Sequence, residues 1–354
     1  MSDAQLIVTH FCIPEHVTRV AVLGEGFIND TYLVETSGTR KYILQKKNRS
    51  VFPDIPGMMT NIDKVTRHIR SKGAVTLTLV PSREEELYYR DSEGEYWTCC
   101  TFIPDTYSYE HAPTKDLVQA GGQGIGMFHS QMADFQGTLT TTLPGFHNIR
   151  YRLGQFSDSA KANHAGRLAG VASLVEEIYN RQEKMESFFQ LIAEGTIPQR
   201  VSHNDTKLSN FLFDKQKKVV CAIDLDTVMQ TTVLYDFGDA VRSYANPFAE
   251  DHPDLSEIVM DLERFTAFSE GYADRAAWFL NDTEKTYLAF SALYITYEQF
   301  LRFLMDYIDG DTYYKIRYPT HNLVRAESQL ALLKSMENMY PQMQDSLKTI
   351  FKTL

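Results

Sequence analysis

The chain has 354 residues, of which 43% are apolar and 23% are charged, and its formal net charge is −11. A chain of this length usually exceeds what one hydrophobic core organises, so we expect two lobes that share a cleft. The acidic balance, with no segment rich in Lys and Arg, argues against a nucleic-acid partner, and no apolar run is long enough to cross a bilayer.

Three β-rich runs open the first lobe at residues 17–23, 31–35 and 41–45, separated by turn-rich clusters at 24–26 and 36–38. This spacing predicts an antiparallel meander. Apolar residues then recur at helical intervals from Met58 to Ile69, and Lys72-Gly73 supplies a glycine stop, so we expect a helix here. Two more strand-like runs, at 75–80 and 96–102, complete a small α+β lobe over residues 1–104.

Residues 105–354 are expected to form a larger, mainly helical lobe. Leu117, Ala120, Gly124 and Phe128 share a helical stripe, and helical segments run through 167–193, 255–272 and 283–307. One β-rich island interrupts them between residues 200 and 223, and polar residues cluster at the ends of its strands. The predicted fold class is therefore α+β, with a small antiparallel-sheet lobe before a larger helical lobe.

The cysteines and the first residues indicate the compartment. Residues 1–16 have no Lys or Arg ahead of an apolar stretch, so they do not read as a secretory signal. The cysteines show no C-x-x-C spacing, and we expect reduced, buried thiols in a cytoplasmic protein. They are Cys12, Cys99, Cys100 and Cys221.

The β-rich island contains a His-x-Asp-x-x-x-x-Asn string at residues 203–210, and Ile223-Asp224-Leu225-Asp226 ends the next apolar strand. Phosphoryl transfer needs a carboxylate to orient and deprotonate the attacking hydroxyl, while an amide oxygen and a second carboxylate hold magnesium. Asp205 is the candidate base, and Asn210 and Asp224 are the candidate magnesium ligands. The separation 224 − 205 = 19 residues fits a loop, a short hairpin and a strand end. The pattern indicates a small-molecule kinase.

Neighbouring side chains are candidates for supporting roles. Lys207 can place its ammonium near the transferring phosphate. His203 is expected to brace the loop rather than to act as an acid or base. Asp226 shares a strand face with Asp224 and is a second candidate metal or substrate ligand. The alternative is a polar hairpin loop in which the same side chains only cap turns.

An Asp-Phe-Gly tripeptide at residues 236–238 resembles the one that carries the metal-binding Asp of protein kinases. The distance 236 − 205 = 31 residues is longer than one hairpin requires, and the segment opens a helix-like run. We therefore expect Asp236 to be a helix N-cap or a partner of the 203–210 loop.

The first lobe offers candidates for nucleotide binding. Gly24 and Gly26 lie between two strands, where backbone N–H groups could cover phosphates, and Asn29 stands where a third glycine would complete the usual kinase loop. A plain hairpin turn is the alternative. Gln45 occupies the place of the phosphate-facing lysine, which leaves Lys46 or Lys47 as the candidate cation. Phe102 and Ile103, at the end of the lobe, are further candidates.

These motifs, in this order, resemble the aminoglycoside phosphotransferase and choline kinase superfamily, and the likeness spans nearly the whole chain. Several stretches are similar to the N-acetylhexosamine 1-kinases, including Gln45, which looks typical of that branch. They lie at residues 26–31, 44–48, 51–52, 144–147, 203–210, 223–227, 235–239 and 302–307.

The resemblance implies a protein-kinase-like two-lobed fold that uses ATP and Mg²⁺ to phosphorylate the anomeric hydroxyl of N-acetylglucosamine or N-acetylgalactosamine. By the same resemblance, Arg302 and Tyr313 match positions expected to line the sugar pocket, and Asp205 would contact the anomeric hydroxyl. An arginine can hydrogen-bond sugar oxygens, and an aromatic ring can cover a sugar's apolar face. A structural role for Arg302 on a long helix, and for Tyr313 in a polar turn, fits equally well.

Other acceptors and another class of protein stay open. An aminoglycoside, a choline-like amine or homoserine would keep the kinase reaction but change the acceptor. A non-catalytic nucleotide or sugar sensor would keep only the fold, although a pure binder has no need of a base. The pattern leaves the hexosamine epimer and the oligomeric state open.

Overall fold

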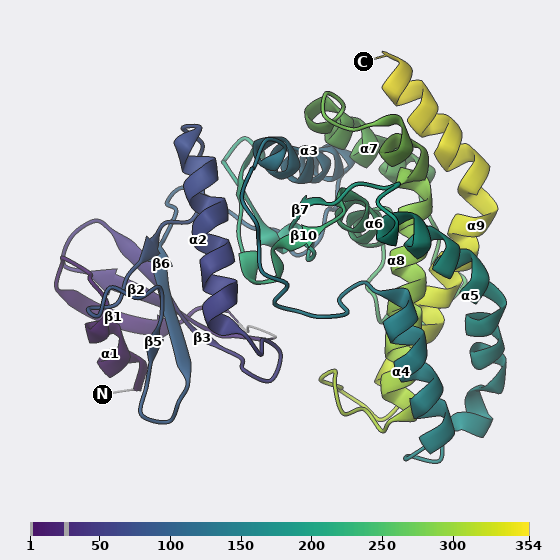
Figure 1. Ribbon diagram of the computed structural model, residues 1–354, viewed down its shortest axis with the longest axis horizontal. Helices are drawn as coiled ribbons and strands as arrows, with labels where there is room; N and C mark the ends of the chain where they lie inside the picture. The colour runs from purple at the N-terminus through teal and green to yellow at the C-terminus, as the bar shows by residue number, and fades with distance from the viewer. Residues whose placement is uncertain (1–2, 25–27, 354) are drawn as a thin grey trace.

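The computed structural model describes residues 3–24 and 28–353. A sheet and one long helix, α2, lie at one end of the molecule, and helices make up most of the remainder (Figure 1). Helices account for 51% of the residues and strands for 13%. The predicted α+β class, with an antiparallel sheet first and a mainly helical part after it, is confirmed.

The sheet of the smaller lobe is antiparallel, in the order β1-β2-β3-β6-β4, with β5 paired to β6. Side chains alternate between the two faces of a strand, so Ile43, Gln45 and Lys47 of β3 share one face, and Tyr42 and Leu44 share the other. Its strands are β1 (Val17–Val22), β2 (Asp30–Thr36), β3 (Lys41–Lys47), β4 (Leu79–Val80), β5 (Tyr89–Arg90) and β6 (Tyr96–Thr101).

The two faces of this sheet have different cores. The short helix α1 (Asp3–Ile7) packs with Phe11 against Val34, Tyr42 and Leu44 in a small apolar cluster. The long helix α2 (Ile55–Ser71) instead buries its apolar stripe in the main core, which continues into the helical lobe. Asp54 caps the start of α2 by accepting from Gly57 N at 2.9 Å, and Gly73 follows its end with φ +74°. Helix α2 therefore joins the lobes through its packing.

The larger lobe is built around α8, which is buried along most of its length and packs against α4, α6 and α9. A capping box at Asn281 and Glu284 starts this helix. The helices of this lobe are α3 (Lys115–Met132), α4 (Ile149–Ala162), α5 (Ala172–Ala193), α6 (Val233–Tyr244), α7 (Leu262–Ala276), α8 (Asp282–Ile308) and α9 (His321–Thr353). Short 3₁₀ turns lie at Val8–His10, Leu168–Val171, Leu208–Asn210 and Leu225–Thr227.

Two small antiparallel ribbons lie within the helical lobe. One pairs β7 (Arg200–Ser202) with β10 (Met229–Thr231), and the other pairs β8 (Phe211–Phe213) with β9 (Val219–Ala222). Helix α6 follows β10 and packs closely on α8, because Gly238 has no side chain there. A Cβ at Gly238 would lie 2.3 Å from the carbonyl oxygen of Ser291. The ribbons and α6 together carry the polar turns that the sequence singled out.

Several predicted elements differ in extent. The strand expected at 75–80 is formed only at Leu79–Val80, and the helix expected from 255 begins at Leu262, where Asp261 caps it by accepting from Glu263 N and Arg264 N. Helices α4 and α9 were not predicted. The predicted lobe boundary at 104 falls between β6 and α3 and stays a prediction.

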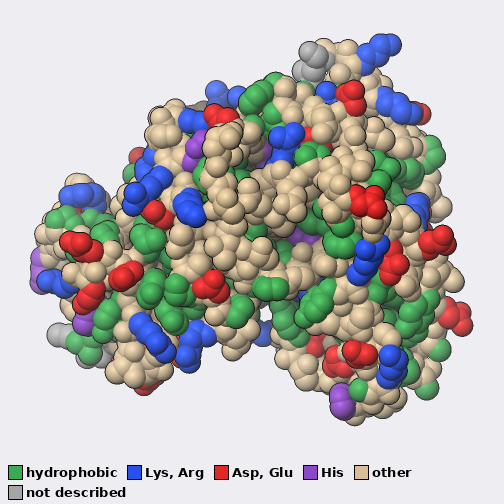
Figure 2. All heavy atoms as spheres, viewed as in Figure 1, with side chains coloured by type: hydrophobic (Ala, Val, Ile, Leu, Met, Phe, Trp, Pro, Cys, Tyr) green, Lys and Arg blue, Asp and Glu red, His purple; other side chains and the backbone are tan. Residues whose placement is uncertain are grey.

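Charged side chains of both signs are mixed on the surface. Lys and Arg are interspersed with Asp and Glu over the face seen in Figure 2, without one dominant charge. All four cysteines are free; Cys99 and Cys221 are buried as expected, whereas Cys100 is partly buried and Cys12 is exposed. Within residues 3–24 and 28–353, no helix has the length and apolar character required to span a membrane.

Candidate active site

The two ribbons bring the two polar turns together. The 203–210 turn runs from β7 to β8, and the 223–228 turn runs from β9 to β10, so both are held by strands that pair with each other. At their junction the backbone N–H of Ile223 donates to the carbonyl oxygen of Asn210 at 2.8 Å. Asp224 therefore directly follows a residue that is bonded to Asn210.

Asp236 anchors the 203–210 turn. It is fully buried in the first turn of α6, and its carboxylate accepts from the backbone N–H groups of His203 and Asn204, each at 2.7 Å. His129 of α3 lies 2.7 Å from the same carboxylate through Nε2. The N-cap of α6 is Thr232, so the capping role considered for Asp236 is wrong, and its contacts are those of a loop partner.

His203 connects the two turns. Its fully buried ring donates from Nε2 to the carbonyl oxygen of Ile223 at 2.8 Å, and Thr227 Oγ1 donates to the carbonyl oxygen of His203 at 2.6 Å. The ring and the carbonyl group of His203 thus both bond to the 223–228 turn. These contacts hold the two turns together, as expected of a structural residue rather than of an acid or base.

Asp205 lies between an amide and an ammonium group. Asn210 Nδ2 donates to a carboxylate oxygen of Asp205 at 3.0 Å and to its carbonyl oxygen at 2.9 Å. Lys207 Nζ lies 3.2 Å from the other carboxylate oxygen, and its side chain is 55% exposed. The charge of Asp205 is the main cause of a raised pKa at Lys207. The next residue, Thr206, is held by Asp239 of α6 through its N–H at 3.1 Å.

Asp224 has a backbone conformation that is rare for a residue other than glycine. Its φ of +55° lies in the left-handed region, where a functional side chain is often held at some cost in strain. The residue is exposed toward a cavity, yet the surrounding protein desolvates its carboxyl and raises the pKa to about 6, with the charge of Asp226 adding to the effect. Asp224 therefore provides a carboxylate in a confined, partly desolvated position.

The cavity has a volume of about 490 Å³ and lies between the sheet and the 203–228 turns. Volumes of this size are usual for small-molecule sites. Apolar side chains make up much of its wall, and Asn210, Asp224 and Asp226 supply polar groups on the side of the helical lobe. The predicted nucleotide contacts Gly24, Gln45, Phe102 and Ile103 all line it. Gly26 lies outside the described residues.

The cation at this cavity is Lys47 rather than Lys46. Gln45 and Lys47 share the face of β3 that lines the cavity, whereas Lys46 points to the opposite face, where its Nζ is 3.9 Å from Glu95. Lys46, the predicted nucleotide contact, thus does not line this cavity, because adjacent strand residues face opposite ways.

Lys47 is held by groups from both lobes. Its Nζ lies 2.8 Å from both carboxylate oxygens of Asp226 and 2.8 Å from Gln45 Oε1. Asn29 Nδ2 also donates to Asp226 at 2.8 Å. Asp226 thus binds side chains of the smaller lobe, and Asp224 is left as the exposed carboxylate of this strand end.

Arg302 and Tyr313 lie next to each other but do not line the interlobe cavity. The guanidinium of Arg302 is 5.8 Å from the ring centre of Tyr313 and 5.5 Å from that of Tyr314. The turn that carries these tyrosines is held by Asp306, which accepts from both backbone N–H groups at 2.8 and 2.9 Å. Tyr313 is 65% exposed.

Sequence reasoning missed two residues that position the loop. Asp239 lies one helical turn after Asp236, a spacing that could have placed both on one face of α6. His129 lies far away in the chain on α3 and has no local motif, so no sequence signal pointed to it.

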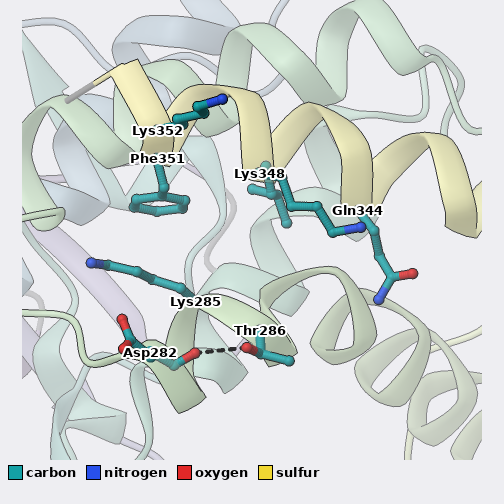
Figure 3. Close-up of a pocket in the computed structure, with 8 residues that line it drawn as sticks. Asp282, Lys285, Thr286, Gln344, Lys348, Phe351 and Lys352 are labelled. Carbon is teal, nitrogen blue, oxygen red and sulfur yellow. Dashed lines mark hydrogen bonds between the residues drawn. The ribbon is translucent and has the colours of Figure 1, made fainter.

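A second cavity, of about 390 Å³, lies between the start of α8 and the end of α9. Figure 3 shows Lys285 extending below the ring of Phe351, and the ammonium lies 5.6 Å from the ring centre. Lys348 and Lys352 also line this cavity. It shares no residue with the Asp205 turn, so we assign the candidate active site to the interlobe cavity.

Comparison with known proteins agrees with this arrangement. The model of the APH family, described as the phosphotransferase enzyme family, matches residues 19–278. A microcompartment-associated aminopropanol kinase is similar in fold, with a TM-score of 0.66, 18% identity, and 96% of this chain and 98% of that chain covered. An amicoumacin kinase in complex with AMP-PNP, Ca²⁺ and Ami has a TM-score of 0.60 and 15% identity, with 97% and 93% covered.

The choline kinase LicA from Streptococcus pneumoniae has the same fold, with a TM-score of 0.51 and 14% identity, and 91% of this chain and 94% of that chain covered. The resemblance to the aminoglycoside phosphotransferase and choline kinase superfamily is confirmed, and with it the kinase-like fold. The matched family covers most of the chain and includes all of the Asp205 and Asp224 turns. The chain belongs to the APH phosphotransferase enzyme family.

Proposed function

We propose that this chain transfers the γ-phosphoryl group of ATP to the anomeric hydroxyl of an N-acetylhexosamine, either N-acetylglucosamine or N-acetylgalactosamine. The observation that carries the proposal is the contact between Asp205 and Asn210, because Asn210 also lines a nucleotide-sized cavity together with Asp224. The two candidate metal ligands therefore line that cavity, and the candidate base is hydrogen-bonded to one of them.

Asp205 is the group that receives the proton. The acceptor oxygen forms a bond to the γ-phosphorus, the bond from that phosphorus to the β–γ bridging oxygen breaks, and the hydroxyl proton passes to the Asp205 carboxylate. Lys207, 3.2 Å from Asp205, offers a positive charge near the transferring group. Asn210 holds the carboxylate in a single orientation.

The donor set fits magnesium. Asn210 uses its amide nitrogen on Asp205, which leaves its amide oxygen for a cation, and Asp224 has no Lys or Arg partner in the part of the chain that is described. Carboxylate and amide oxygens are ligands that Mg²⁺ prefers. When bound with ATP, the metal neutralises charge on the β- and γ-phosphates. A related fold has been solved with AMP-PNP and Ca²⁺, which supports a nucleotide and a divalent cation here.

Lys47 is the candidate phosphate-facing cation of the sheet. It lines the cavity together with Gln45, and Asp226 holds it in position from the helical lobe. The apolar wall near Phe102 and Ile103 suits the flat base of the nucleotide. These positions divide the cavity into an apolar end and a phosphate end.

Arg302 and Tyr313 are the proposed sugar contacts. The guanidinium packs against the aromatic rings of Tyr313 and Tyr314, which limits its freedom and leaves its donors for sugar oxygens or an acetamido carbonyl. The exposed ring of Tyr313 could cover the apolar face of a sugar.

An amino alcohol is the second candidate acceptor, because a structural neighbour is an aminopropanol kinase and another is a choline kinase. To decide between the two, the protein is incubated with ATP, Mg²⁺ and N-acetylhexosamines, amino alcohols or aminoglycosides, and the phosphorylated product is identified by mass spectrometry and NMR. We expect a sugar 1-phosphate. A phosphorylated amino alcohol would replace the sugar assignment, and turnover that survives in Asp205→Asn would refute the proposed base.

A further inference from the structure

A cluster of polar side chains lies in the helical lobe outside the nucleotide cavity. We call His147, Arg152, Glu298 and Tyr314 the acceptor cluster. His147 Nδ1 lies 2.8 Å from Glu298 Oε2, and Arg152 Nε lies 3.5 Å from the other carboxylate oxygen. The side chains of His147 and Glu298 are only 7% and 1% exposed. Together they form a compact polar centre in the helical lobe.

Arg152 Nε and Glu298 Oε1 face each other in this ion pair, whereas two other buried atoms of the cluster have no hydrogen-bond partner within the described residues. They are His147 Nε2 and the Tyr314 hydroxyl. A buried polar atom without a partner costs free energy, so natural proteins rarely leave such an atom without a use. The set contains both donors and acceptors. Such a mixture matches a ligand whose hydroxyl and amide groups both donate and accept.

The cluster is connected to the 203–210 turn. The ring of His147 lies 4.9 Å from that of Tyr235, the residue that precedes Asp236 on α6. On the next turn of α6, Asp239 holds the N–H of Thr206, and the charge of His147 is among the causes that lower the pKa of Asp239. The cluster therefore packs on the same helix, α6, that anchors the turn of Asp205.

The charges around the cluster do not favour a cation. Glu298 is paired with His147 and Arg152, and Asp239 and Glu250 are both paired with Arg242. A cationic acceptor would need a carboxylate that is not already neutralised. Arg302, by contrast, forms no ion pair with any carboxylate among residues 3–24 and 28–353, and its Nη1 donates only to the neutral Gln299 at 2.9 Å. Each of these carboxylates is therefore already paired, which leaves none of them for a cationic acceptor.

We propose that His147 Nε2 and the Tyr314 hydroxyl hydrogen-bond the hydroxyl and amide groups of a neutral acceptor, and that the paired carboxylates around them disfavour a cationic one. The inference rests on the proposed function, since it names residues that select the acceptor of the same reaction. His147 is the centre of this recognition, because its Nδ1 is held by Glu298 and its Nε2 is left for the ligand.

The test is a binding measurement, which does not require turnover. Calorimetry with Mg²⁺ and AMP-PNP present compares N-acetylglucosamine, choline and kanamycin on the full chain. The variant is His147→Asn, because His147 has φ +55°, a conformation that asparagine tolerates, and the shorter amide can keep the contact with Glu298 while Nε2 is lost. The matched control is His164→Asn, a histidine exposed on the loop after α4.

We expect the sugar to bind and the two cations not to bind. His147→Asn should weaken sugar binding about tenfold, the effect of one lost hydrogen bond, with the Kd for AMP-PNP unchanged. If His147→Asn does not fold, Glu298→Gln, which keeps the shape of the side chain, provides the same comparison. Equal sugar affinity in the folded variant and the wild type, tighter binding of a cation, or no binding of the sugar would each overturn the inference. A sugar that binds as expected but is never phosphorylated would instead refute the proposed function.

Discussion

Lys47 of the sheet and Asp226 of the helical lobe form a buried ion pair in which Nζ is 2.8 Å from both carboxylate oxygens. Their side chains are 3% and 5% exposed, so each charge depends on the other for compensation. The pair lies in the wall of the interlobe cavity and joins β3 to the turn that carries Asp224. It is therefore a direct polar link between the two lobes at the candidate active site.

Removing one partner of this pair should destabilise the fold more than removing both. We expect Lys47→Met to lower the free energy of unfolding by about 3–5 kcal/mol, because it leaves the charge of Asp226 buried and unpaired. The double variant Lys47→Met/Asp226→Asn leaves no charge and should lose less. Urea unfolding of the wild type, both single variants and the double variant gives the coupling energy between Lys47 and Asp226. If the double variant loses as much free energy of unfolding as the two single variants added together, this view is contradicted.

Removing the Asp224 carboxylate should weaken nucleotide binding, whereas removing the Asp236 carboxylate should lower stability. Asp224→Asn removes a carboxylate that faces the cavity, so we expect a large loss of magnesium-dependent nucleotide binding with little change in the melting temperature. Asp236→Asn disturbs a fully buried acceptor of three hydrogen bonds and should cost at least about 2 kcal/mol of stability. Nucleotide titrations with and without Mg²⁺, together with thermal melts, separate these effects. Equal loss of metal dependence in the two variants would overturn the assignment.

Glu298 should make the protein sensitive to acid. Burial alone would raise its pKa, but the charge and hydrogen bond of His147 and the charges of Arg302 and Arg152 lower it from 4.5 to about 2. A folded-state pKa below the unfolded value stabilises the native state fully above about pH 4.5, and this contribution is lost as pH falls toward 2.

The size of this contribution is about 3 kcal/mol, from about 1.4 kcal/mol for each unit of pKa. We expect the free energy of unfolding of the wild type to fall more steeply between pH 4.5 and pH 2 than that of Glu298→Gln, which has no carboxyl to titrate. Urea unfolding at a series of pH values measures the two slopes. Parallel curves for the two proteins would show that Glu298 has an ordinary pKa.

Gly238 should not tolerate a methyl group. A Cβ there would lie 2.3 Å from the carbonyl oxygen of Ser291, so Gly238→Ala must separate α6 from α8 and should cost about 1–3 kcal/mol. Gly154 of α4 is the matched control, since no atom lies within 4 Å of a Cβ there. Gly154→Ala should stabilise its helix by up to about 1 kcal/mol. Equal melting temperatures for the two variants would show that the α6–α8 contact can relax.

The residues proposed to act on the substrates were easier to predict from the sequence than the residues that hold them in place. Asp205, Asn210 and Asp224 lie within one short β-rich island, where the order of loop, hairpin and strand end determines which residues become neighbours. Lys47 could have been chosen over Lys46 from strand alternation alone, since Gln45 already faced the cavity. His129 could not have been found in this way, because its contact with Asp236 depends on how α3 and α6 pack.

The helices missed by sequence reasoning have weak local patterns. Helix α4 buries only Ile149, Leu153 and Phe156, and the rest of its surface is partly or fully exposed. Helix α9 contains Pro341, which usually ends or kinks a helix, yet the helix runs from His321 to Thr353. Packing on α8 and α7 stabilises α9, and such tertiary contacts are not visible in a local window.

The burial of Asp236 has a consequence for motion. The amide hydrogens of His203 and Asn204 are covered by one carboxylate, which is in turn bonded to His129 of another helix. Solvent can reach these amides only when α3 and α6 come apart, so their hydrogen exchange should be as slow as that of the most protected core amides. The backbone on either side of the base would then stay rigid on the timescale of lobe movements, and the approach of substrates would depend on the sheet and the surface loops.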